Sequence, residues 1–322
     1  MASGQHHTLQ PEVYHYCFGA FEPAVRIHSG DSVTSETVDA RGGDSRGDPI
    51  PESKKQRMEG TTLKQSNPCV GPIFVEEAEE GDTLAVHIRR IRLNREFAFS
   101  KQSEHFGSLT GEGVGHRLLY NEPIPTLYYR WQLDLERNVG VLEMPGSRLG
   151  RAEAPLSPFI GSIGVAPRFG RVETTLTPGE FGGNMDCVET REGTVLYLPV
   201  WTRGAYLFFG DIHALQGDGE VNGTALETTA EVTLDVEVLK GRRADLPRLE
   251  SDSHIMVIGC TRPLMDCVRL AQIGLLEWLV DDYGFEREEA WQLMAQVATM
   301  RIGNVVDPRY AVVSRFPKTY LP

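Results

Sequence analysis

Short runs in which apolar and polar residues partly alternate fill most of the chain up to about residue 260, and Gly, Pro and Asp interrupt them. Alternation with a period of two is typical of strands that bury one face. Neighbouring runs lie about ten residues apart, the spacing of a sandwich or a barrel. We predict strands at Glu12–Ile27, Ser32–Val38, Gly71–Glu77, Thr83–Ile91, Thr194–Trp201, Ala205–Phe209 and Ala230–Leu239.

The pattern changes over residues 263–300, where apolar residues recur every three or four positions. This period predicts a helix over Pro263–Asp282, with Gly284 placed to end it. A second helix is expected over Glu286–Met300, because its first residues are acidic and suit a helix N-terminus. The two segments predict a helical hairpin attached to a β body.

Two polar stretches lack any periodicity. Residues 1–10 are expected to form a flexible N-terminus. Residues 41–65 are rich in Gly, Asp, Ser and Lys and contain Pro49 and Pro51. A loop of this length is usually functional or disordered, so it is either a disordered surface loop or a lid over a site. Because neither a repeat nor a linker is visible, residues 11–322 are interpreted as one domain.

Composition narrows the range of partners. The formal net charge of −13 argues against nucleic acid and anionic membranes as main partners. No apolar run approaches the roughly 20 residues that cross a bilayer, and the polar N-terminus lacks a signal core. We therefore expect a cytoplasmic protein without membrane contact. The five scattered cysteines include no CxxC pair, so reduced thiols are expected.

Candidate metal ligands lie two positions apart in two segments. In Gly182–Cys187, Asn184 and Asp186 share one face if the chain is extended, and Asp211 and His213 have the same spacing just after an apolar run. An Asp and a His on one face can reach a common metal ion. Each pair also has an ordinary interpretation, as a turn, a cap or a packed histidine.

A third polar segment, Gln216-Gly-Asp-Gly-Glu220, follows directly. It adds the carboxylates of Asp218 and Glu220 between glycines that let backbone approach a ligand closely. Asp218-Gly219 alone is a common hairpin turn. The crowding of these residues behind an apolar run indicates a ligand site as readily as a structural turn.

Together the segments Gly182–Cys187, Leu196–Val200 and Gly210–Val221 resemble the acetamidase/formamidase family. The resemblance implies a mainly β fold, a β-sandwich with a C-terminal helical hairpin. It also implies hydrolysis of short aliphatic amides to a carboxylate and ammonia, a small neutral amide as substrate, and a homo-oligomer. A divalent metal ion is implied as cofactor, with zinc or calcium as first candidates.

The resemblance carries the family's polar positions onto this chain, and we assign them hypothetical roles. The expected metal ligands are Asp186, Asp211, His213 and Asp218. The expected catalytic residues are Glu220 as the proton carrier, and Asn184 and Gln216 to orient the amide or stabilise its oxyanion. Asp39 is a further candidate carboxylate, with an ordinary loop residue as the equal alternative.

Two rival interpretations remain open. One is a homologue that binds metal without catalysis. The other is an amidase with Cys187 as nucleophile, which would need a nearby base and a lowered thiol pKa. Asp186 beside it would oppose that lowering.

Overall fold

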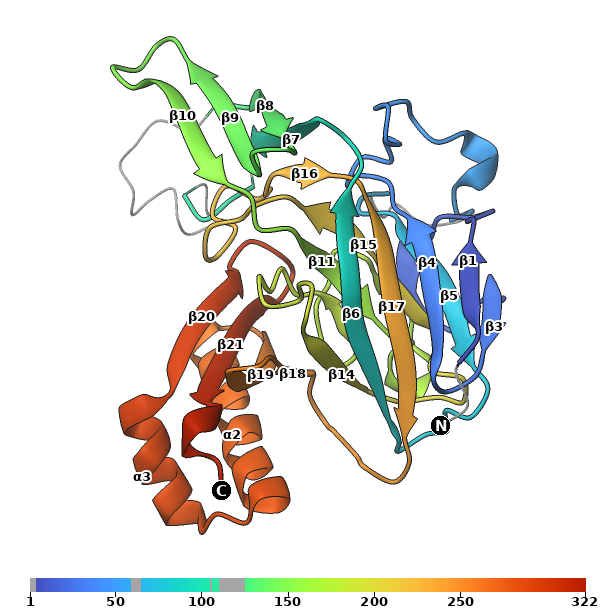
Figure 1. Ribbon diagram of the computed structural model, residues 1–322, viewed down its shortest axis with the longest axis vertical. Coiled ribbons are helices and arrows are strands. Elements are labelled where there is room, and N and C mark those ends of the chain that lie inside the picture. Colours follow the sequence, from blue (N-terminus) through green and yellow to red (C-terminus); the bar gives the residue numbers. More distant parts are fainter. Residues whose placement is uncertain (1–3, 59–64, 105, 110–124) are drawn as a thin grey trace.

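The computed structural model describes residues 4–58, 65–104, 106–109 and 125–322, and shows two large sheets packed face to face (Figure 1). Strand residues of both sheets, such as Val232 and Leu234 from one and Ile160 and Phe208 from the other, meet in one buried core. The predicted β-sandwich is therefore confirmed.

In the described part of the chain the first sheet has nine strands, and its longest pairing is the antiparallel one between β6 and β17. Alternate residues of β17 are buried, as period-two patterning requires. In spatial order the strands are β1 (His6–Leu9), β4 (Asp31–Glu36), β17 (Ala230–Leu239), β6 (Thr83–Leu93), β14 (Val195–Pro199), β18 (Arg248–Glu250), β19 (His254–Thr261), β21 (Tyr310–Pro317) and β20 (Thr299–Asn304).

The second sheet has ten strands among the described residues and carries the polar segments. Strands β8 to β10 extend away from the rest of the molecule, at the top of the view in Figure 1. The path runs through β10 (Gly150–Pro155), β9 (Val139–Met144), β8 (Leu127–Asp134), β7 (Phe97–Gln102), β16 (Glu227–Thr228), β15 (Leu207–His213), β11 (Phe159–Gly164) and β13 (Gly182–Asn184), with β5 (Cys69–Val75) joining β15 to β3 (Val25–Ile27). Strands β2 (Cys17–Phe18) and β12 (Glu173–Thr174) form a separate pair.

The predicted helical hairpin is confirmed as α2 (Leu264–Tyr283) and α3 (Arg287–Val297). Gly284 ends α2 in the left-handed conformation that glycine adopts without steric cost. Leu275, Trp278 and Leu279 of α2 pack against Ile255 and Val257 of β19 in a second core. The expected second helix stops early, because the chain turns at Ala298 and Thr299 begins β20. The residues that the structure describes also include three short 3₁₀ turns: Glu52–Lys54, Arg168–Gly170 and Lys318–Tyr320.

Three sequence expectations need correction. Residues 12–27 form the short strands β2 and β3 with irregular backbone between them, because several positions bond to other segments; the amide of His15, for example, donates to Cys69. Residues 6–9, expected to be flexible, form β1, and His7 there pairs with Asp31. Strands β8 and β10 lie outside the predicted set, because nearly all of their residues are at least partly exposed on both faces and no buried apolar face marks them in the sequence.

The polar stretch 41–65 is described only at residues 41–58 and 65. Its first part folds back on the sandwich, since Gly43 donates to Asp39 and Ile50 packs in the main core. All five cysteines are buried and form no disulfides, as expected for reduced thiols. Within the described ranges, no helix is both long and apolar enough to cross a bilayer.

Candidate functional site

The polar segments converge where β11 lies between its two neighbours. Ser162 of β11 is paired with Asn184 of β13 on one side and with Gly210 of β15 on the other. Asp186 follows β13, and Asp211 and His213 end β15, so the sheet itself brings the two sequence motifs together. The side chains of Asp186, Asp211 and His213, three of the four predicted ligands, are buried.

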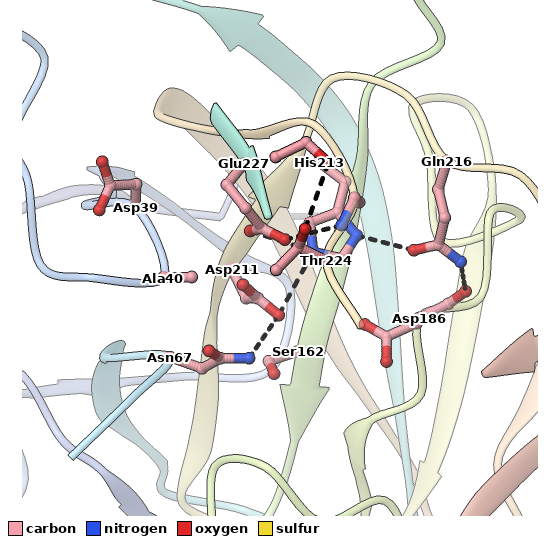
Figure 2. Close-up of polar contacts among 12 residues, drawn as sticks. Asp39, Ala40, Asn67, Ser162, Asp186, Asp211, His213, Gln216, Thr224 and Glu227 are labelled. Carbon is pink, nitrogen blue, oxygen red and sulfur yellow. Dashed lines mark hydrogen bonds and ion pairs between the residues drawn. The ribbon is translucent and has the colours of Figure 1, made fainter. Parts of the chain in front are cut away.

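His213 is held in a defined orientation by Gln216. The Gln216 amide nitrogen donates to the carbonyls of Asp186 (3.0 Å) and Gly303 (2.9 Å), so its oxygen faces the His213 ring at 3.0 Å (Figure 2). His213 Nδ1 must therefore carry the hydrogen in this bond. Nε2 points toward the buried carboxylates of Asp186, Asp211, Glu220 and Glu227, which together with His213 are called the cluster below. A second bond of this kind is how proteins orient a histidine that binds a metal.

Nε2 of His213 faces two carboxylates. It lies 3.5 Å from Asp211 Oδ2 and 3.4 Å from Glu227 Oε2. It has no hydrogen-bond partner in the described structure, and the same holds for Asp186 Oδ1, Asp211 Oδ1 and Glu227 Oε2. Buried polar atoms normally have partners, so converging atoms without one indicate a missing ligand.

A second group shares the histidine. Single donor atoms of Asp186, His213 and Glu220 lie within 4.8 Å of one another, as do those of Asp211, His213 and Glu227. Asp186, Asp211 and Glu220 all have positive φ values, from 47° to 56°. Such backbone is uncommon outside glycine and persists where the surroundings impose it, often at functional sites.

Burial and the closeness of several carboxylates raise the pKa values of the site carboxyl groups. Burial, reinforced by the neighbouring carboxylates, raises the pKa of Asp186 well above its usual value. Burial likewise raises the pKa of Glu220 well above normal, that of Glu227 to a lesser degree, and that of Asp307 to about 7. Burial alone would lower the pKa of His213, but Glu227 and Asp211 outweigh it and raise that pKa.

Amide side chains tie the carboxylates to one another. Asn67 donates to Asp211 at 2.9 Å, and Asn184 donates to Asp307 at 2.8 Å. Asn304 donates to Asp186 Oδ2 at 3.2 Å. Ser162 donates to the side-chain oxygen of Asn184. These donors hold the acceptor atoms in place without neutralising them.

The donor set fits a divalent cation. Zinc bonds to nitrogen and oxygen are about 2.0–2.2 Å long, and tetrahedral geometry then separates neighbouring donors by roughly 3.3–3.6 Å. The separations from His213 Nε2 to Asp211 and Glu227 match this spacing. The two carboxylates that raise the pKa of His213 would equally stabilise a cation at Nε2.

Asp218 does not join this group, contrary to its prediction as a ligand. It is half exposed and forms a salt bridge with Arg301, whose guanidinium also lies 3.5 Å from Glu189. Its neighbour Gly219 has a φ of 87° and places Asp218 in a surface turn. Glu220, two positions later, is buried and belongs to the cluster.

Two other expected roles change. Gln216 uses its whole amide within the protein, so it positions His213 and leaves no group for a substrate. Asp39 is paired with the buried Arg95 at 2.7 Å and accepts from two backbone amides, which makes it a structural residue of the loop after β4.

The environment of Cys187 argues against the alternative in which this residue is the nucleophile of an amidase. Burial and the nearby Glu189 raise the pKa of its thiol well above normal, and the thiol donates to that carboxylate. A reactive cysteine needs the opposite environment.

Three site residues were missed from the sequence: Glu227, Asp307 and Asn67. Glu227 lies in the two-residue strand β16, and Asp307 follows β20. Asp307 stands in the segment Val305-Val-Asp-Pro308, which weakly resembles the family but offers no pattern that marks a ligand.

A cavity of about 490 Å³ opens onto the cluster. Its inner end is lined by Glu220, Glu227, Asp307 and Asn184. Its outer part is lined by Arg41, Lys101, Phe99, Phe106 and Tyr128, among others.

Comparison with known proteins identifies the family. The sequence model of the Acetamidase/Formamidase family matches residues 169–319. This range includes the carboxylates and the histidine of the site, whereas Asn67 and Ser162, which donate hydrogen bonds to it, lie before the range. A crystal structure of acetamidase from Yersinia enterocolitica superposes with a TM-score of 0.84 at 36% identity, over 100% of this chain and 94% of that one. The chain belongs to the acetamidase/formamidase family.

Other family members agree. The structure of an acetamidase from Bacillus halodurans has a TM-score of 0.81 and 28% identity, and covers 97% of this chain and 98% of that one. The acetamidase of Mycolicibacterium smegmatis is 31% identical over 153 residues, 43% of this chain. The chain spans 36% of that acetamidase and 66% of another curated relative, so the match to these proteins is partial.

Proposed function

We propose that the protein is a metal-dependent hydrolase of small amides, which releases a carboxylate and ammonia. The observation that carries the proposal is the set of buried donor atoms without partners around His213 Nε2, at the end of a cavity. Membership of the acetamidase/formamidase family supports the amide as substrate class. A homo-oligomer and a cytoplasmic location remain predictions.

Asp211, His213 and Glu227 would hold the ion, with Asp186 beside them. When bound, a divalent ion polarises the amide carbonyl and lowers the pKa of water in the site. The distances around Nε2 favour zinc over calcium, since calcium takes six to eight oxygen ligands. Asp218 is left out of the ligand set because it pairs with Arg301 at the surface.

Glu220 is the proton carrier in this proposal. It lines the cavity, whereas Asp186, Asp211 and His213 lie behind it. Its raised pKa suits a carboxyl group that takes a proton from water and delivers it to the leaving nitrogen. The Asn184 side chain also lines the cavity, but its oxygen accepts from Ser162 and Asn67 and its nitrogen donates to Asp186 and Asp307, so it would position these groups and not the substrate.

The test separates binding from catalysis. His213→Ala should lose most bound metal and with it ammonia release from acetamide and formamide. Glu220→Gln should keep its metal and lose roughly 10²–10⁴-fold in kcat. Metal content by elemental analysis and ammonia release are measured on the same preparations. Full metal occupancy and rate in His213→Ala would refute the ligand assignment.

The same experiment addresses the non-catalytic alternative. A wild-type protein that binds zinc stoichiometrically and releases no ammonia from any amide would support a binding protein instead.

A further inference from the structure

The cavity above the cluster has opposite charges at its two ends. Glu220, Glu227 and Asp307 line the inner end, and Arg41 and Lys101 line the outer part. This polarity is unexpected in a chain of net charge −13, where cations are outnumbered by carboxylates. A ligand that spans the cavity would meet the cluster with one end and cations with the other.

Arg41 and Lys101 have no ion-pair partner among the described residues. Most other arginines here do pair with carboxylates: Arg46, on the same loop, pairs with Asp44 and Asp48. Charged groups held near a surface without a counter-charge attract ligands of opposite sign. Arg41 and Lys101 are therefore available to a carboxylate that enters from solvent.

Aromatic rings fix the direction of these cations. The Arg41 guanidinium lies 4.2 Å from the centre of the Phe99 ring and 4.5 Å from that of Tyr128. The Lys101 ammonium lies 5.5 Å from the Tyr128 ring. Tyr128 and Lys101 are direct partners across β7 and β8. A stacked guanidinium keeps its edge free for the two oxygens of a carboxylate.

The backbone at Arg41 is also fixed. Asp39 accepts from the amide of Arg41 at 2.9 Å and binds the buried Arg95 at 2.7 Å. Arg95 in turn donates to the carbonyl of Glu227 at 3.1 Å, a residue of the cluster (Figure 2 shows Asp39 and Glu227). The outer cation and the inner carboxylates are therefore joined through one buried ion pair.

The size of the cavity points the same way. At about 490 Å³ it lies within the range of pockets that bury ligands much larger than a four-atom amide. Acetamide would leave the outer part of the cavity, and both cations, without contact.

We propose that the preferred substrates are amides that carry a carboxylate, namely the monoamides of short dicarboxylic acids. The amide is hydrolysed at the inner cluster while Arg41 and Lys101 bind the distant carboxylate. This inference rests on the proposed amide hydrolysis and names its substrate class.

The experiment measures a ratio of two kcat/KM values on the zinc-loaded protein. Succinamate and glutaramate are each compared with a neutral amide of the same shape, 4-methylpentanamide and 5-methylhexanamide, in which an isopropyl group replaces the carboxylate. Wild type should prefer at least one acid by roughly tenfold, as a charge-assisted bond at a partly exposed site allows. The preference should shrink as the salt concentration rises.

Arg41→Gln and Lys101→Gln should each lower the ratio by several-fold, and the double variant should abolish it. Arg46→Gln is the matched control, since it removes one positive charge from the same loop but outside the cavity. An acid-to-neutral ratio near one in wild type, or an equal drop in Arg46→Gln, overturns the substrate class while amide hydrolysis stands. A protein that hydrolyses neither kind of amide overturns both proposals.

Discussion

At the scale of single residues, the site depends on which atoms are already satisfied within the protein. Gln216 and Asp218 are two positions apart, yet one holds His213 from the inside and the other pairs with Arg301 at the surface. Sequence proximity to a motif is therefore a weaker guide to a ligand than burial and free lone pairs.

Gln216→Leu should weaken zinc binding by about 10–100-fold with the fold intact, because the His213 ring loses the bond that orients it. Zinc affinity is measured by competition with a chelator, and folding by circular dichroism. Asp218→Asn is the control and should bind zinc like wild type. Zinc loss in Asp218→Asn would restore Asp218 as a ligand and refute the present ligand set.

At the scale of elements, β11 lies between β13 and β15 and sets the distance between the site residues that these two strands carry. Gly161 lies between Ile160, which is paired with Ile212, and Ser162, which is paired with Gly210. A Cβ at Gly161 would lie 2.8 Å from the His213 ring and 2.9 Å from Asp186 Oδ1. The absent side chain is thus what lets β15 and the residues after β13 share one cluster.

Gly161→Ala should lower kcat/KM for acetamide by about a hundredfold, because a displacement of about 1 Å at a reacting site has effects of that size. Overpacking should also reduce the free energy of unfolding by about 1–3 kcal/mol. Gly146→Ala is the matched control, since an added Cβ there meets no atom within 4 Å. Wild-type turnover in Gly161→Ala would show that the cluster is not the reacting site.

The same elements show how far the sequence could lead. The spacing of Asp211 and His213 correctly predicted that both face one space, and the helical hairpin followed from its period alone. Glu227 could not be found in this way, since β16 is too short to carry a pattern and its place beside β15 depends on pairing between distant segments. The residues around Glu227 therefore do not indicate which strand β16 pairs with.

At the scale of the whole molecule, a buried group of carboxylates opposes folding unless something neutralises it. Asp186, Glu220 and Glu227 have raised pKa values mainly through burial, so each would rather be protonated or bound to a cation. A cation bound only by the folded chain shifts the folding equilibrium toward it.

Chelation of the wild-type protein should therefore lower Tm, by about 4 °C if zinc had been present at a hundred times its dissociation constant. Differential scanning calorimetry with and without chelator gives the shift. His213→Ala should have a Tm that responds little to chelator. An equal response in wild type and His213→Ala would place the stabilising ion elsewhere.

The network of amides around the cluster has a consequence for the newly made chain. Asn67 and Asp211, which are bonded to each other, are 144 positions apart, and Asn184 and Asp307 are 123 apart. During synthesis on the ribosome, Asn67 is made long before Asp307, and these hydrogen bonds can all form only after Asp307 has been made. Under the proposed metal dependence, capture of the ion would then be a late event of biogenesis, and the unfinished chain would remain without it until residue 307 is made.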